Sequence, residues 1–216
     1  MGLFGEEQRV ENVPQAFAAL VVAEAPASIA LSGGDTARAC YELLATADAD
    51  WRRVAVWFGD ERWVPVHDPE SNEGMARVTF LDEVEPLAIH SMYGAGPTPD
   101  EAAASYGRLV RDAPPIELVH LGLGPDGHTA SLFPGSPALD EQKHLVVATG
   151  DDLHVHRRLT FTFPAIARAK LVVVTVAGAS KRDALARIRA GDDLPAGRVR
   201  AERVVWLVDT DAANGA

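Results

Sequence analysis

Short apolar segments alternate with segments of helical periodicity along this chain. The apolar segments cover residues 27–31, 53–58, 116–121, 172–176 and 204–208. Helical spacing or helix-start signals mark residues 13–23, 37–45, 72–84, 98–111 and 181–190. Strands that are separated by helices pair in parallel, because each helical crossover returns the chain to the same end of the sheet. The sequence therefore predicts an α/β fold with a mainly parallel sheet flanked by helices. Residues 144–148 and 159–163 are further strand candidates.

Length and composition are those of a globular protein. The 216 residues are 47% apolar and 24% charged, enough to bury a sizeable core. We expect a single domain over residues 1–216, with a disordered tail over residues 210–216. The net charge of −11 argues against nucleic acid or an anionic membrane as a partner, since both bind basic surfaces. An anionic substrate would need a local basic cluster.

Cysteine content and hydropathy bear on the compartment. The chain has one cysteine, Cys40, so a disulfide framework is impossible and a reducing compartment is expected. No run approaches the roughly 18 apolar residues of a membrane span, and the N-terminus lacks the apolar core of a signal peptide. These features predict a cytoplasmic protein. A metal site is not expected, because His154 and His156 have no further metal ligands near them in the sequence.

The apolar segment 116–121 leads into a loop, residues 122–135, with four glycines, two prolines and an Asp-x-His pair. Loops that follow parallel strands are where α/β proteins bind ligands. Glycines let the backbone approach a ligand closely, and Asp126 and His128 bring together an acceptor and a near-neutral base. We interpret this loop as the active site. A tight turn with a surface histidine is the alternative for so short a motif.

Three other loops could bind an anion. Gly33 and Gly34 join a strand to a helix that begins near Thr36, and free amides at a helix N-terminus attract phosphate. A plain turn with Thr36 as N-cap explains the same residues. Arg62 follows a second strand and could clamp a phosphate, although a solvated ion pair is the alternative. Lys181 starts a helix after a third strand, where a solvated lysine is the alternative. Ser71 or Asn72 is expected to cap the helix that follows them.

Four segments of the chain together resemble the 6-phosphogluconolactonases. They stand in the family's order, and the third is the most specific. The matching segments are residues 31–36, 58–65 with 71–72, 122–135, and 157–160 with Lys181.

This resemblance implies a modified Rossmann-like sheet of the glucosamine-6-phosphate isomerase/6-phosphogluconolactonase type. It also implies a cytoplasmic, monomeric enzyme of the pentose phosphate pathway. The implied reaction is hydrolysis of the small-molecule sugar-phosphate lactone 6-phospho-D-glucono-1,5-lactone to 6-phosphogluconate, without a metal or organic cofactor.

Roles for individual residues follow from the same resemblance. His128 is expected to be the general base that activates water, and Asp126 its partner. The Gly-rich loop is expected to aim backbone amides at the oxyanion. The residues expected to bind the phosphate or the rest of the substrate are Gly33, Gly34, Thr36, Arg62, Arg158 and Lys181.

The sequence departs from the family pattern in places. Ala37 stands where the family often has proline, and Asp35 adds an acid beside the expected phosphate turn. Residues 154–156 replace a commonly Pro-rich approach to the arginine pair. Either Arg157 or Arg158 could face the ligand, and the register of the following Leu-Thr favours Arg158.

Three other functions fit parts of the sequence. Sugar-phosphate isomerases or deaminases share the fold, but their Asp-Gly-His loop continues with an Asn-Glu pair, where this chain has residues 131–134 as Ser-Leu-Phe-Pro. A serine hydrolase could use Ser131, although no Gly-x-Ser-x-Gly motif occurs. A non-catalytic sugar-phosphate sensor could keep the phosphate ligands and dispense with the base.

Overall fold

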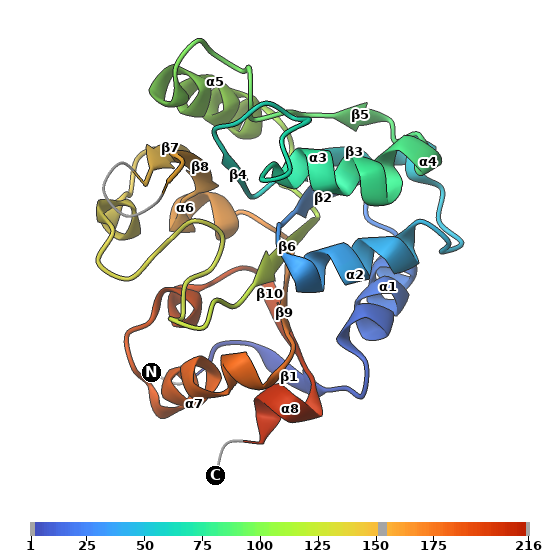
Figure 1. Ribbon diagram of the computed structural model, residues 1–216, viewed down its shortest axis with the longest axis vertical. Helices are drawn as coiled ribbons and strands as arrows, with labels where there is room; N and C mark the ends of the chain where they lie inside the picture. The colour runs from blue at the N-terminus through green and yellow to red at the C-terminus, as the bar shows by residue number, and fades with distance from the viewer. Residues whose placement is uncertain (1–2, 151–154, 215–216) are drawn as a thin grey trace.

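Figure 1 shows the computed structural model of the protein, which describes residues 3–150 and 155–214. Its main feature is a parallel sheet with the strand order β1-β10-β9-β6-β2-β3-β5. The strands are Glu6–Arg9 (β1), Ser28–Leu31 (β2), Ala55–Phe58 (β3), Ala88–Ile89 (β5), Leu118–Gly122 (β6), Leu171–Val176 (β9) and Arg203–Val208 (β10).

After the edge strand β1, the chain builds this sheet outward from its middle. After β2 it adds β3 and β5 on one side, and after β6 it adds β9 and β10 on the other. The direction of growth therefore reverses between β2 and β6. Ligands of open parallel sheets bind at the carboxyl ends of the strands at such a reversal.

A second, antiparallel sheet has the order β4-β8-β7. Its strands are Asp60–Arg62 (β4), Val146–Thr149 (β7) and Arg158–Phe161 (β8). Gly59 joins the two sheets, because its amide donates to Leu31 O (2.8 Å) and its carbonyl accepts from Phe161 N (2.7 Å). Helix α5, Pro99–Asp112, packs against β7 and β8 (Figure 1).

Helices flank the parallel sheet. Helices α1 and α2 lie side by side, and α1 packs on β9 and β10 (Figure 1). A π-helical turn, Arg77–Leu81, joins α3 to α4. The remaining bounds are Val13–Glu24 (α1), Asp35–Leu44 (α2), Asn72–Ala76 (α3), Asp82–Val84 (α4), Phe163–Ile166 (α6), Arg182–Ala190 (α7) and Thr210–Ala213 (α8), with 3₁₀ turns at Trp51–Arg53, Pro137–Asp140, Ala179–Lys181 and Pro195–Arg198.

The predicted fold class is confirmed. The central strand β9 is buried along its whole length, as its unbroken apolar run indicated. Thr98 caps α5 by accepting a hydrogen bond from Glu101 N (3.3 Å), and Ser71 caps α3 by accepting from Gly74 N (3.0 Å). No helix formed by residues 3–150 and 155–214 has the length and apolar character needed to cross a membrane.

Three features differ from expectation. Strand β1 and the short strand β5 were not predicted, and the strands predicted near residues 146 and 160 belong to the separate antiparallel sheet. The predicted disorder from Thr210 is wrong for Thr210–Ala213, which forms helix α8. Asp209 Oδ1 caps this helix by accepting from Ala212 N (2.7 Å), and Ala212 is fully buried, so the segment is anchored.

Candidate active site

A cavity opens at the carboxyl ends of β2 and β6, the two strands between which the direction of strand addition reverses. Its walls come from the loops after β2, β6 and β9, and from strands β4 and β8 of the small sheet. The sequence-predicted site residues that line it are Gly33, Gly34, Thr36, Arg62, His128, Arg158 and Lys181. The structure thus brings together residues that lie up to 148 positions apart.

The remaining predicted residue, Asp126, contacts His128. Asp126 Oδ1 lies 2.5 Å from His128 Nδ1 and also accepts from the His128 backbone amide at 3.2 Å. Gly124 makes room for this pair, because a Cβ on Gly124 would lie 2.1 Å from His128 Nδ1 and 2.7 Å from Asp126 Oδ1. Phe133 packs against the imidazole at a centroid distance of 4.4 Å. The ring is therefore held from several sides.

The charge state of Asp126 fixes the histidine tautomer. Partial burial raises the pKa of Asp126, but the hydrogen bonds and charge of His128 outweigh burial and keep the pKa below its usual range. An ionised carboxylate is only an acceptor, so His128 Nδ1 donates to it. In the neutral ring the other nitrogen, Nε2, then carries the lone pair that a base needs.

Two glycine amides of this loop bond within the loop itself. Gly124 N donates to His128 O (2.8 Å), and Gly127 N donates to Gly124 O (3.0 Å). These two amides shape the loop and are not available to an oxyanion, while the expectation for the other amides of the loop stays a prediction. Gly127 has φ +88°, a conformation that side chains strain to adopt, which explains the glycine there.

The turn after β2 is an open helix N-terminus. Gly34 is the N-cap of α2, with φ +91°, and makes no side-chain capping bond. The alternative with Thr36 as N-cap is therefore wrong, since Thr36 lies inside the first turn of the helix. Backbone amides at an N-terminus without a side-chain cap can bind an anion. Asp35 also lies in this first turn.

Asn72 connects this turn to Arg62. A Cβ on Gly33 would lie 1.9 Å from Asn72 Oδ1, so only glycine fits. Asn72 Oδ1 accepts from Arg62 Nη1 (2.9 Å), while Asn72 Nδ2 donates to Asp60 O (2.9 Å). Arg62 Nη1 also donates to Glu70 O at 2.8 Å. The guanidinium is thus aimed by two acceptors.

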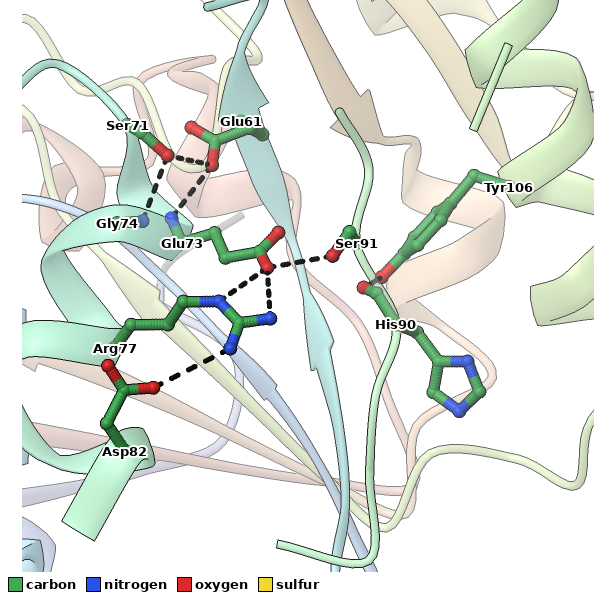
Figure 2. Close-up of polar contacts among 9 residues, drawn as sticks. All are labelled: Glu61, Ser71, Glu73, Gly74, Arg77, Asp82, His90, Ser91 and Tyr106. Atoms are coloured by element: carbon green, nitrogen blue, oxygen red, sulfur yellow. Dashed lines mark hydrogen bonds and ion pairs between the residues drawn. The ribbon is translucent and has the colours of Figure 1, made fainter. Parts of the chain in front are cut away.

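Glu61 and Ser71 fix the helix that carries Asn72 (Figure 2). Glu61 accepts hydrogen bonds from Asn72 N, Glu73 N, Ser71 Oγ and Arg62 N, all between 2.7 and 2.9 Å. Burial raises the pKa of Glu61 to about 7 against these bonds, which favour the ionised form. The sequence predicted only a cap at residue 71 or 72, and the support from Glu61 depends on a contact that no local pattern marks.

Arg158 stands beside Arg62, its pairing partner across β4 and β8. Its guanidinium lies 5.3 Å from the centre of the Phe133 ring and makes one long bond to Ser131 Oγ (3.5 Å). Burial lowers the pKa of Arg158, and Asp60 partly opposes this. Arg157 instead pairs with Asp100 (3.0 Å). Of the two arginines that the sequence left open, Arg158 lines the cavity.

Lys181 approaches from the 3₁₀ turn after β9. Burial lowers the pKa of its ammonium, while the nearby charges of Asp126 and Asp35 favour the protonated form. Lys181 therefore interacts electrostatically with both Asp126 and Asp35, and it lines the same cavity as His128 and Gly34. Three cations, Arg62, Arg158 and Lys181, line one cavity of a protein with net charge −11.

Ser131 has no access to a substrate. Its side chain is fully buried, and Ser131 Oγ donates to Asp60 Oδ2 at 2.7 Å. A covalent serine mechanism therefore has no support. Within residues 3–150 and 155–214, no cluster of three His, Cys, Asp or Glu side chains could hold a metal ion. His154, the first member of the His-x-His pair, lies outside the described residues.

Comparison with known proteins identifies the family. The family model described as "Glucosamine-6-phosphate isomerases/6-phosphogluconolactonase" matches residues 6–206. The chain belongs to this family. The 6-phosphogluconolactonase of Synechocystis sp. is 42% identical over 202 residues, which cover 87% of this chain and 83% of that protein. The predicted resemblance is thereby confirmed.

Solved structures of the family share the fold. The 6-phosphogluconolactonase of Thermotoga maritima is 26% identical, with a TM-score of 0.84, over 95% of this chain and 99% of that chain. A monomeric glucosamine-6-phosphate deaminase reaches a TM-score of 0.85 at 20% identity, over 96% and 98% of the two chains. The fold therefore does not separate the two activities of the family.

Proposed function

We propose that this protein is a 6-phosphogluconolactonase, a single-domain enzyme that hydrolyses 6-phospho-D-glucono-1,5-lactone to 6-phosphogluconate. The observation that carries the proposal is the Asp126–His128 pair, 2.5 Å apart, beside a cavity lined by Arg62, Arg158 and Lys181. A base and a cluster of cations in one cavity suit a substrate that carries both a reactive carbonyl and a phosphate. The identity to curated lactonases supports the same substrate.

In the proposed reaction His128 Nε2 takes a proton from water as the water oxygen attacks C1 of the lactone. Asp126 stabilises the resulting imidazolium and keeps the ring in the required tautomer. The bond between C1 and the ring oxygen then breaks, and the imidazolium returns the proton to that oxygen. The product is an open-chain acid with a hydroxyl on C5. A lactone carbonyl is already activated, so no covalent nucleophile is required.

The cations bind the phosphate far from the reacting carbon. Arg158 and Lys181 are partly desolvated, which strengthens their attraction for a dianion. Arg62 is aimed by Asn72 and Glu70, and the amides at the start of α2, around Gly33, Gly34 and Thr36, add donors on the same side of the cavity. Binding energy gained there orients the ring toward His128.

The test is the rate of acid release from freshly made 6-phosphogluconolactone at constant pH, measured above the spontaneous reaction. We expect the wild type to accelerate the reaction and His128→Ala to lose about 10² to 10⁴ of kcat, the usual contribution of a general base. His144→Ala is the matched control, because His144 also pairs with a carboxylate, Glu141 (3.0 Å), but does not line the cavity.

Two results would contradict the proposal. A folded wild type that leaves the spontaneous rate unchanged is no lactonase, and equal losses in His128→Ala and His144→Ala would show that the effect is not specific to the cavity. Ammonia release from glucosamine 6-phosphate, assayed in parallel, would favour the deaminase activity of the family instead.

A further inference from the structure

A second histidine of β6 is not used in the proposed reaction. His120 lies in the core with no exposed surface, and its ring stacks on Phe17 at a centroid distance of 4.1 Å. Burial lowers the pKa of His120 to about 3, so the ring is neutral near neutral pH. A neutral imidazole has one donor and one acceptor. Both ring nitrogens have a partner, which makes His120 part of a chain of hydrogen bonds.

This chain joins two residues that line the cavity. His120 Nδ1 lies 2.9 Å from Tyr41 Oη, and His120 Nε2 lies 2.9 Å from Thr175 Oγ1. Tyr41 Oη in turn accepts from Ser32 N at 2.7 Å. Ser32 and Thr175 both line the cavity, one after β2 and the other on β9. The chain therefore runs through the core from Ser32 to Thr175, both on the parallel-sheet side of the cavity.

Thr175 has open space beside it. In the register of β6 and β9, Thr175 pairs with Gly122, and neighbouring residues in a parallel sheet point to the same face. A Cβ on Gly122 would meet no atom within 4 Å, and Gly122 also lines the cavity. The missing side chain at position 122 leaves room for a ligand next to the Thr175 hydroxyl.

The distances assign the protons along the chain. Tyr41 has one hydroxyl proton, and Tyr41 Oη lies 2.9 Å from His120 Nδ1 but 3.2 Å from Ser32 O. The shorter distance favours a bond from this proton to Nδ1, and in that tautomer the ring proton is on Nε2 and donates to Thr175 Oγ1. The Thr175 hydrogen is then left with Leu121 O at 3.4 Å, beyond the usual length of such a bond.

We propose that the Thr175 hydroxyl donates a hydrogen bond to an oxygen of the sugar ring or its substituents, and that His120 is the positioning residue that orients this hydroxyl. The inference rests on the proposed lactonase function and adds a ligand for the sugar to those for the phosphate. Tyr41 completes the chain by fixing the tautomer of His120.

The first experiment compares Thr175→Val with Thr175→Ser. Valine keeps the shape but removes the hydroxyl, so KM for 6-phosphogluconolactone should rise about tenfold while kcat stays within about twofold, because the bond forms in the ground state and the transition state alike. Serine keeps the hydroxyl and should restore KM. A KM for Thr175→Val within twofold of wild type would overturn the proposal.

The second experiment tests whether a hydrogen-bond donor at position 120 is needed to orient the Thr175 hydroxyl. The amide of His120→Gln can still donate to Thr175, whereas His120→Leu cannot, so KM should rise in the leucine variant and stay near wild type in the glutamine variant. Thermal unfolding of both variants separates this effect from lost stability. A purely structural role would give unfolding shifts without this difference in KM, and would remove His120 from the proposal.

The tautomer of His120 can be measured directly by NMR spectroscopy. Long-range ¹H–¹⁵N correlation spectra of the wild type should show His120 protonated on Nε2. Protonation on Nδ1 would make Thr175 a donor to His120 instead and would overturn its assignment as a donor to the sugar.

The two proposals fail in different ways. A wild type without lactonase activity refutes the proposed function, and titration with the product 6-phosphogluconate then tests Thr175 alone, with about tenfold weaker binding expected for Thr175→Val. A wild type that neither turns over nor binds 6-phosphogluconate refutes both.

Discussion

The cavity has two unlike walls. The wall from the parallel sheet carries the Asp126–His128 pair and Lys181, on loops at the carboxyl ends of β6 and β9. The wall from the antiparallel sheet carries Arg62 and Arg158 on two paired strands. The first wall places the base with one cation, and the second places two fixed positive charges.

The difference lies in how each wall is held. The loop of His128 is shaped by its own backbone, through bonds such as Gly124 N to His128 O. Arg62 is aimed instead by side-chain and backbone acceptors on another segment, Asn72 Oδ1 and Glu70 O. A histidine base needs its ring held in one orientation and one tautomer, whereas a phosphate can bind to several cations in less strictly defined positions. Variants on the two walls should therefore have different kinetic signatures.

Asp126→Asn should give the largest effect. The amide cannot stabilise the imidazolium and can hold the wrong tautomer, so kcat should fall about 10² to 10⁴-fold with little change in KM. The pKa of Asp126 lies below its usual range, so the wild-type carboxylate is charged near neutral pH, and the loss of kcat should be present across that whole pH range.

The pH-rate profile of Asp126→Asn, measured beside Glu141→Gln, checks this prediction. Glu141 pairs with His144 outside the cavity, so its variant should keep the wild-type profile. A profile for Asp126→Asn that matches wild type would mean that the pair seen in the structure has no part in the rate.

Arg158→Gln should give the second-largest effect, and it tests the antiparallel-sheet wall. It removes a partly buried cation whose side-chain hydrogen bond within residues 3–150 and 155–214, to Ser131 Oγ, is long, so its charge is available to a ligand. We expect kcat/KM to fall about 10²-fold, mainly through KM, as for a lost charge-assisted hydrogen bond. The wild-type KM should also rise with salt, and this dependence should weaken in the variant.

Arg187→Gln serves as the control, because Arg187 pairs with Asp192 on the surface. If kcat of Arg158→Gln fell and KM did not change, the division of labour between the two walls would be wrong.

The sequence predicted one wall better than the other. Loop 122–135 places its functional residues within a few positions of a buried strand, so local pattern was enough to find Asp126 and His128. Lys181 and Gly34 follow strands in the same way. Arg62 also follows a strand, but a solvated ion pair explained it as well, and Arg158 was found only through the family resemblance.

The sequence did not indicate the residues that hold the site residues in position. Asn72 acts on Gly33 and Arg62 across 39 and 10 residues, and His120 reaches Thr175 across 55. His120 lies inside an apolar run that predicts only a buried strand. Polar contacts of this kind exist only after the sheet has brought distant strands together, so periodicity and propensity carry no signal for them. The small sheet was missed for the same reason.

Gly122→Ala should give the smallest effect and tests the open space on the first wall. The backbone of Gly122 is outside the left-handed region, and a Cβ there would meet nothing within 4 Å, so alanine fits the free protein. Alanine should even stabilise the fold slightly, by about 0.4 to 1 kcal/mol, because it restricts the unfolded chain. In the complex, the added methyl group would occupy space that the sugar needs. KM should therefore rise by about tenfold while kcat changes little.

The matched control for this last variant is Gly107→Ala. Gly107 lies in α5, away from the cavity, and a Cβ there makes only ordinary contact, 3.5 Å to Val146 N. Both variants should unfold at or above the wild-type temperature, but only Gly122→Ala should bind substrate more weakly. If the two variants shared the wild-type KM, the space beside Gly122 would not be occupied by substrate, and the sugar would have to lie nearer the arginine wall. That result would also remove the room that Thr175 needs to contact a ligand, so this substitution tests the placement of the sugar independently of any change to Thr175 itself.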